Sequence, residues 1–104
     1  LDLGAWSRLP AAVARGDAGA LAGWTPAQGV DALQKLCHDL LAQSVGAAPR
    51  YFSAADLPAA PTAALAQWSK ELARSAGMVE HPLNAGLMLE ALVSQARKAL
   101  NSKP

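Results

Sequence analysis

Aromatic residues, charged residues and cysteine are all scarce in this sequence. Phe, Trp and Tyr make up 5% of its 104 residues, and Asp, Glu, Lys and Arg make up 16%. The shortage of aromatic and β-branched residues disfavours a β-sheet, because strands favour these residue types. The single cysteine, Cys37, cannot form a disulfide within the chain, which is typical of a protein of the reducing cytoplasm.

Long hydrophobic runs are also absent. No apolar stretch approaches the roughly 20 residues that a membrane-spanning helix needs, and the chain does not open with a signal-peptide pattern. We therefore expect no membrane association and a cytoplasmic location. Because the first residues are Leu-Asp-Leu rather than Met, we expect the chain to be part of a longer polypeptide.

Positive charge is dispersed along the chain. The formal net charge is +1, and the nine Lys and Arg residues do not form the dense stripe that would neutralise a run of phosphates. Direct binding of nucleic acid by this chain is therefore disfavoured.

Residues that could carry catalysis do not form a recognisable site. His38, His81 and Cys37 lack the spacing of a zinc site. Cys37 falls on an apolar helical stripe, so we interpret it as a small buried hydrophobic residue rather than a nucleophile, and His38 as a surface or boundary residue. Asp31 and Asp39 lie eight residues apart on a helix, Glu71 and Glu90 belong to different helices, and most of these carboxylates are interpreted as solvated, with no acid–base pair among them. We predict no catalytic residue, no cofactor and no metal ligand.

Alanine is abundant, and its strong helix propensity favours an all-helical domain with closely packed helices. The clearest helix follows Trp24. Thr25 is predicted to be its N-cap, Pro26 suits the first helical position, and Gln28 completes a capping box. The apolar stripe of this helix recurs at helical spacing and comprises Val30, Leu33, Leu36, Cys37, Leu40, Leu41 and Ser44. Asp31 and Lys35 are predicted to form an exposed ion pair, and Gly46 follows the end of the helix.

Two shorter segments precede that helix. The first contains Pro10, which is tolerable if Ser7 caps a helix that begins there; if the helix instead begins earlier, Pro10 should kink it. Gly16 is expected to end this helix. Asp17 can then cap a short helix that runs through Ala22.

The segment 47–61, rich in Ala and Pro, is predicted to be a loop with at most one short turn within 53–57. We expect Tyr51 and Phe52 to hold this loop against the helices, and we assign the loop no further role.

A third helix is predicted over 62–76, with Leu65, Trp68, Leu72 and Ala76 on its buried face. Gly77 is expected to cap its end in a left-handed conformation, with Met78 packed back on the last turn.

A final helix is predicted over 85–101, with a buried stripe of Leu89, Leu92, Val93, Ala96 and Leu100. Asn84 should be its N-cap, and Leu83 and Met88 should form a hydrophobic staple, after an extended approach through His81 and Pro82. Gly86, in the first turn, leaves room for a neighbouring backbone.

Together these elements predict one domain over residues 1–104, an all-α, compact helical bundle of four to five helices. Trp68 is assigned to the core. Four other aromatic residues could be core residues or anchors for a partner protein, and we retain them as interface candidates: Trp6, Trp24, Tyr51 and Phe52.

The order of these pieces resembles the C-terminal domain of the delta-prime subunits of bacterial DNA polymerase III, which are clamp-loader subunits. One matching stretch is the helix from Trp24 to Leu41, with its aspartate and paired leucines. The other is the closing pattern Asn84-x-x-Leu87-x-Leu89-Glu90-x-Leu92, which is similar to the last collar helix of clamp-loader subunits.

The resemblance implies an architectural, non-catalytic role within a DNA polymerase holoenzyme. The collar domains of the delta-prime, delta and gamma/tau subunits associate into a five-membered ring while the sliding clamp is loaded on primed DNA. The family's ATPase-like domains, zinc module and arginine-finger motif would lie upstream, so none can be placed on these residues. The segment 47–61 departs from any motif of the family. A stand-alone helical adaptor that binds a partner helix in a groove is the main alternative, and a helical nucleic-acid-binding module is the third.

Overall fold

Helices account for all the regular structure in the computed structural model, which describes residues 3–79 and 84–103. Four α-helices and two short 3-10 helices occur in the order α1 (Leu3–Ala14), η1 (Ala18–Leu21), α2 (Pro26–Ser44), η2 (Ala54–Asp56), α3 (Thr62–Ala76) and α4 (Ala85–Leu100). The prediction of a compact all-α bundle is confirmed.

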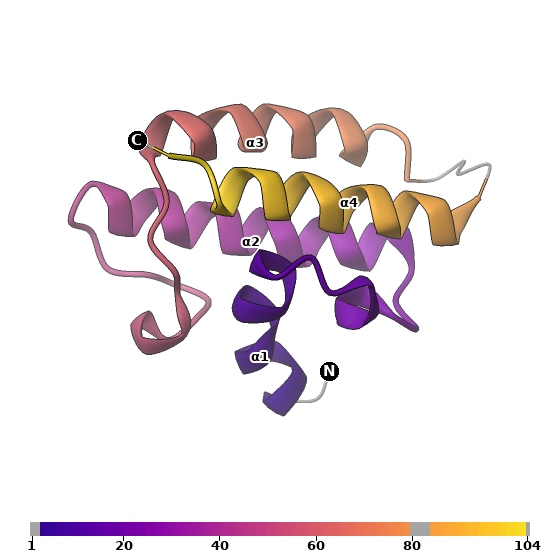
Figure 1. Ribbon diagram of the computed structural model, residues 1–104, viewed down its shortest axis with the longest axis horizontal. Coiled ribbons are helices and arrows are strands. Elements are labelled where there is room, and N and C mark those ends of the chain that lie inside the picture. The colour runs from indigo at the N-terminus through magenta and orange to yellow at the C-terminus, as the bar shows by residue number, and fades with distance from the viewer. Residues whose placement is uncertain (1–2, 80–83, 104) are drawn as a thin grey trace.

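The three longer helices form a layer to which the N-terminal helix is added. Figure 1 shows α2, α3 and α4 side by side along the long axis, each running opposite in direction to the helix before it, whereas α1 lies below them and crosses their direction. α2 packs on both α3 and α4, and α1 packs chiefly on α4 and on the two 3-10 helices. The short η2, which is part of the loop between α2 and α3, therefore places this loop against α1.

The core lies between the apolar stripes that the sequence predicted. Leu33, Leu65 and Leu92 have no more than 1% of their surface exposed, and Trp68 is equally buried, as expected. Leu41, Ala76 and Leu89 are partly buried, and Ser44 is exposed at the end of its stripe. Among the described residues, the largest fully buried side chains are those of Pro10, Val13, Leu21, Leu33, Leu36, Asp39, Leu65, Trp68, Leu72 and Leu92.

The first helix corrects one prediction. Ser7 lies inside α1 and its hydroxyl donates to the carbonyl of Gly4 at 3.1 Å, so it is not an N-cap. The alternative, a helix that already runs before Pro10, is the arrangement observed. Pro10 cannot donate to the carbonyl of Trp6 one turn earlier, and the kink expected there stays a prediction.

The capping predictions at the starts of η1, α2 and α4 are confirmed. The Thr25 hydroxyl accepts from the backbone N–H of Gln28 at 3.2 Å, while the Gln28 side chain accepts from the N–H of Thr25 at 2.9 Å. The Asn84 side chain accepts from the N–H of Leu87 at 2.9 Å, and Asp17 caps η1.

The end of α3 differs from the prediction. Gly77 is its C-cap but has a right-handed conformation, with φ −71° and ψ −11°, and Met78 is 60% exposed rather than packed on the last turn. The N–H groups of Gly77 and Met78 donate to the carbonyls of Arg74 and Ser75 at 3.2 and 3.0 Å. This tight turn satisfies the last carbonyls without a positive φ, so no left-handed residue is needed.

Close helix approach occurs at Gly29 rather than at Gly86. A Cβ at Gly29 would lie 3.1 Å from the Leu89 side chain, so the small residue lets α4 pack tightly on α2. Among the described residues, only the Asn84 side chain would lie within 4 Å of a Cβ at Gly86, so none of their backbones makes the close approach expected there.

The predicted staple between Leu83 and Met88, and the extended approach through His81 and Pro82, involve positions outside the described residues.

Candidate functional site

A buried carboxylate on α2 organises the loop that follows this helix. The Asp39 side chain has no exposed surface. Its Oδ1 accepts from the backbone N–H of Arg50 at 2.9 Å, and its Oδ2 accepts from those of Tyr51 and Phe52 at 2.8 and 2.7 Å. Three consecutive amides of the loop are thus bound to one side chain. Asp39 is therefore an exception to the expectation that most carboxylates of this chain are solvated.

The hydrogen bonds keep Asp39 ionised despite its burial. Burial raises the pKa of the carboxyl group, but the loop amides and the His38 ring lower it by more, so that the pKa of Asp39 lies below its ordinary value. An ionised carboxylate only accepts hydrogen bonds. The Nδ1 of His38, 3.0 Å from Oδ1, must therefore carry a proton, which leaves Nε2 of the ring directed away from this hydrogen bond.

Two aromatic side chains fasten α1 to the same loop. The Phe52 ring is buried and stacks on the ring of Trp6, with a centroid separation of 4.4 Å and an angle of 6° between planes. The indole Nε1 of Trp6 donates to the carbonyl of Tyr51 at 3.0 Å. The prediction that Tyr51 and Phe52 hold the loop against the helices is confirmed, and in this arrangement Phe52 is a core residue.

Tyr51 points the other way, onto the surface of α2. Its side chain is partly exposed, with 37% of the residue's surface accessible. Its ring packs edge-on against the His38 ring, with 5.5 Å between the two ring centroids. The cationic groups of Lys35 and Arg50 lie 5.7 and 5.5 Å from the centre of the Tyr51 ring, within the range of cation–π attraction. We call the four residues of this surface the Tyr51 patch: Lys35, His38, Arg50 and Tyr51.

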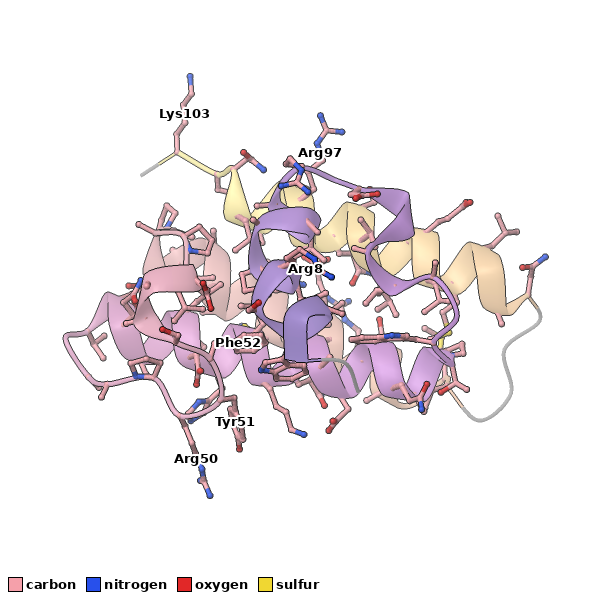
Figure 2. All side chains as sticks on the ribbon, turned by 90° about the horizontal axis from the view of Figure 1, so that it is seen from below. Arg8, Arg50, Tyr51, Phe52, Arg97 and Lys103 are labelled. Carbon is pink, nitrogen blue, oxygen red and sulfur yellow. The ribbon has the colours of Figure 1, made fainter. Side chains whose placement is uncertain are left out.

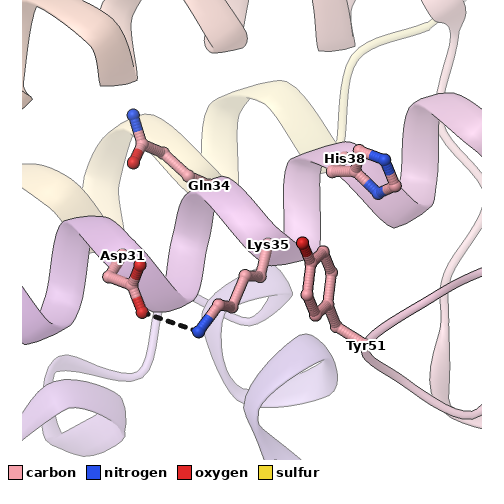
Figure 3. A pocket seen from close by; sticks show the side chains of 5 residues that line it. All are labelled: Asp31, Gln34, Lys35, His38 and Tyr51. Atoms are coloured by element: carbon pink, nitrogen blue, oxygen red, sulfur yellow. Dashed lines mark ion pairs between the residues drawn. The ribbon is translucent and has the colours of Figure 1, made fainter.

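A shallow hollow of about 220 Å³ adjoins the Tyr51 patch. Figure 3 shows that its wall on α2 comes from successive turns of the helix and that the Tyr51 ring faces this wall from the loop. Lys35 forms the predicted ion pair with Asp31, at 2.9 Å. The lining residues are Asp31, Gln34, Lys35, His38 and Tyr51. This set offers hydrogen-bond donors, acceptors and an aromatic ring, the functional groups of a binding surface.

Cys37 does not contribute to this surface. It is 2% exposed, and its Sγ donates to the carbonyl of Leu65 at 3.4 Å. Burial raises the pKa of the thiol to about 11, so the group is protonated at neutral pH. Its prediction as a small buried residue is confirmed, as is that of His38 as a boundary residue, whose side chain is 54% exposed.

The structure brings together three of the four predicted interface candidates. Trp6, Tyr51 and Phe52 form one cluster, in which Phe52 is buried, Trp6 is half-buried and Tyr51 is exposed. Trp24 is partly buried at the junction before α2, at the opposite end of that helix from the loop. The prediction missed Asp39, although the sequence held a signal.

The signal for Asp39 is its place in the helical pattern. Asp39 follows Leu36 by three residues and precedes Leu40, so it falls on the apolar stripe of α2. A carboxylate on a buried stripe requires hydrogen-bond partners, and the proline-rich loop that follows could supply unpaired amides. Arg50 was missed because its role depends on where that loop lies.

Within residues 3–79 and 84–103, no group of three or more His, Cys, Asp or Glu side chains is placed to hold a metal ion. No helix in that part of the chain is both long and apolar enough to cross a membrane. Comparison of the sequence with models of protein families and with curated proteins, and of the structure with solved structures, found no match.

Proposed function

We propose that this chain is a non-catalytic oligomerisation domain of a bacterial clamp loader, the C-terminal collar domain of a delta-prime subunit of DNA polymerase III. In this role it associates with the collar domains of the delta and gamma/tau subunits. The ring so formed holds the loader together while the sliding clamp is placed on primed DNA. The domain itself acts in the cytoplasm, without a cofactor and without direct contact to nucleic acid.

One observation carries the proposal: the two stretches that resemble clamp-loader collars become the two helices that pack on each other in the middle of an all-helical bundle. Leu33, Leu36 and Leu40 of the first stretch are buried, as is Leu92 of the second. α2 and α4 are in contact, and the small Gly29 allows their close approach. A collar requires such helical domains, which present their outer faces to one another.

The experiment that tests the proposal is assembly of the intact subunit that carries this domain. Purified delta and gamma/tau subunits are mixed with the intact candidate subunit or with a version that lacks residues 1–104, and the complexes are measured by native mass spectrometry. We expect the intact subunit to enter a five-membered complex and the shortened version to remain outside it.

An intact subunit that fails to join the other clamp-loader subunits would refute the proposal. Equal incorporation of the shortened version would show that assembly does not depend on this domain. Recovery of the intact subunit with an unrelated protein, and not with the clamp-loader subunits, would favour the alternative of a helical adaptor.

A further inference from the structure

We propose that the Tyr51 patch is the surface with which this domain binds a carboxylate-bearing segment of the neighbouring clamp-loader subunit. The inference rests on the proposed function and specifies which face of the domain makes the contact. The patch lies on the outside of α2 and on the loop after it, away from the apolar core.

The patch is held in position before a partner binds. The backbone of Arg50 and Tyr51 is bound to Asp39, and the carbonyl of Tyr51 also accepts from Trp6 of α1. A loop without regular structure would otherwise lose backbone conformational entropy on binding, which weakens association. Two separate helices therefore fix a short segment whose side chains point outward.

The composition of the patch is that of an interface centre. Tyrosine and arginine are enriched at interfaces and among the residues that dominate binding energy. The exposed face of Tyr51 combines an apolar ring with a hydroxyl group. Beside it, Gln34 and His38 provide further hydrogen-bonding groups in the hollow.

The charges of the patch favour a carboxylate partner. Lys35 has a counter-ion in Asp31, but no carboxylate of a described residue forms an ion pair with the guanidinium group of Arg50. The buried carboxylate of Asp39 binds only the backbone of this arginine. An Arg guanidinium group binds carboxylates through two parallel hydrogen bonds, which gives both affinity and orientation. An Asp or Glu side chain of the partner that reaches the Arg50 guanidinium group, which lies against the Tyr51 ring, would complete this missing pair.

The same surface is less suited to a phosphate backbone. Of the two basic side chains in the Tyr51 patch, Lys35 is already paired with Asp31, which leaves only Arg50 without a carboxylate partner among the described residues. The labelled cations on this side of the molecule are also dispersed: in Figure 2, Arg97 and Lys103 lie at the opposite edge from Arg50, with Arg8 between them. Nucleic-acid binding depends on neutralising several successive phosphates, so the arrangement favours a protein partner.

The test measures binding of the intact subunit to the purified delta and gamma/tau subunits, with surface-immobilised partners and Kd values at low and high salt. Arg50→Glu reverses the unpaired charge, and Tyr51→Ala removes the ring, while both keep the backbone amides that Asp39 binds. Lys70→Glu is the matched control, because Lys70 is an exposed cation on α3 whose substitution changes the net charge equally.

We expect Arg50→Glu and Tyr51→Ala each to raise the Kd by about tenfold or more, equivalent to about 1.4 kcal/mol. The effect of Arg50→Glu should be smaller at high salt, since salt screens exposed charges, and that of Tyr51→Ala should not. Lys70→Glu should change the Kd by less than about twofold. Thermal melts of the variants establish that all of them are folded.

Wild-type-like binding by folded Arg50→Glu and Tyr51→Ala variants would overturn the inference but leave the proposed function standing. Failure of the wild-type subunit to bind either partner would instead refute the proposed function, and the inference with it. A third arm uses fluorescently labelled primed DNA. If Arg50→Glu weakens DNA binding and leaves subunit binding unchanged, the patch is a nucleic-acid site and the inference is wrong.

Discussion

The isosteric substitution Asp39→Asn tests whether the buried carboxylate holds the 50–52 segment in place. It keeps the size of the side chain, so it creates no cavity, and it replaces one acceptor oxygen with an amide group that donates. In the native chain, Oδ1 of Asp39 accepts from Arg50 and His38, and Oδ2 accepts from Tyr51 and Phe52. Either orientation of the Asn amide therefore leaves at least one backbone N–H facing a donor.

The expected loss of unfolding free energy follows from counting these hydrogen bonds. The less costly orientation places the amide nitrogen at the Oδ1 position, where His38 can adapt by accepting through its other tautomer. The N–H of Arg50 is then left without an acceptor, at a cost of about 1–3 kcal/mol. The two bonds from Tyr51 and Phe52 change from charge-assisted to neutral, which loses about 1 kcal/mol each. Relief of the buried charge offsets part of this sum, so we expect a net loss of about 3 kcal/mol.

The assay is equilibrium unfolding in urea together with thermal melting of the 104-residue chain. A loss of about 3 kcal/mol corresponds to a fall of about 15 °C in Tm for a domain of this size. Asp31→Asn is the control: it removes an exposed aspartate from the same helix and should cost about 0.5 kcal/mol or less. Native-state hydrogen exchange should show that the Arg50, Tyr51 and Phe52 amides lose protection in Asp39→Asn. A loss below about 1 kcal/mol, or one equal to that of Asp31→Asn, would refute the reasoning.

Three further predictions follow from local features. The folded-state pKa of Asp39 is lowered, so its contribution to stability is fully present above the unfolded-state pKa of about 4 and is lost as pH falls through the folded-state pKa. When the unfolding free energy is measured against pH, the curve of Asp39→Asn should therefore be flatter below pH 4 than that of the wild type. Parallel curves would contradict this. Asn84→Ala should lose about 1 kcal/mol in urea unfolding while Asn84→Ser stays within about 0.5 kcal/mol of wild type, and equal midpoints for all three would exclude the cap. Cys37 should react with a thiol reagent at pH 8 only after unfolding, since its pKa of about 11 and its burial suppress the thiolate; rapid stoichiometric labelling of the folded chain would oppose this.

Sequence reasoning succeeded where the signal is local. Thr25, Pro26 and Gln28 specify a helix start by themselves, because a capping box needs only residues within one turn. The buried stripes of α2 and α4 were also predictable, since the helical period alone places their leucines on one face.

Prediction failed where a residue's role depends on tertiary neighbours. Gly77 permits a left-handed conformation but does not require one, and the backbone bonds of a tight turn made the right-handed form sufficient. Ser7 is a good N-cap residue in isolation, but the helix already runs before it. In both cases the residue has the expected local preference, but the surrounding backbone determines its conformation.

Asp39 shows why the candidate site was harder to predict than the fold. Its position on the stripe could have indicated burial, but its partners lie eleven to thirteen residues further along, in a loop without a periodic pattern. That loop sends Phe52 inward to stack on Trp6 and Tyr51 outward onto α2. Adjacent residues thus serve the core and the surface, and one carboxylate fixes both orientations. A substitution at Asp39 should therefore weaken stability and subunit binding together, whereas Arg50→Glu, which leaves the same hydrogen bonds intact, should weaken binding alone. This difference separates the framework of the site from the surface that it presents.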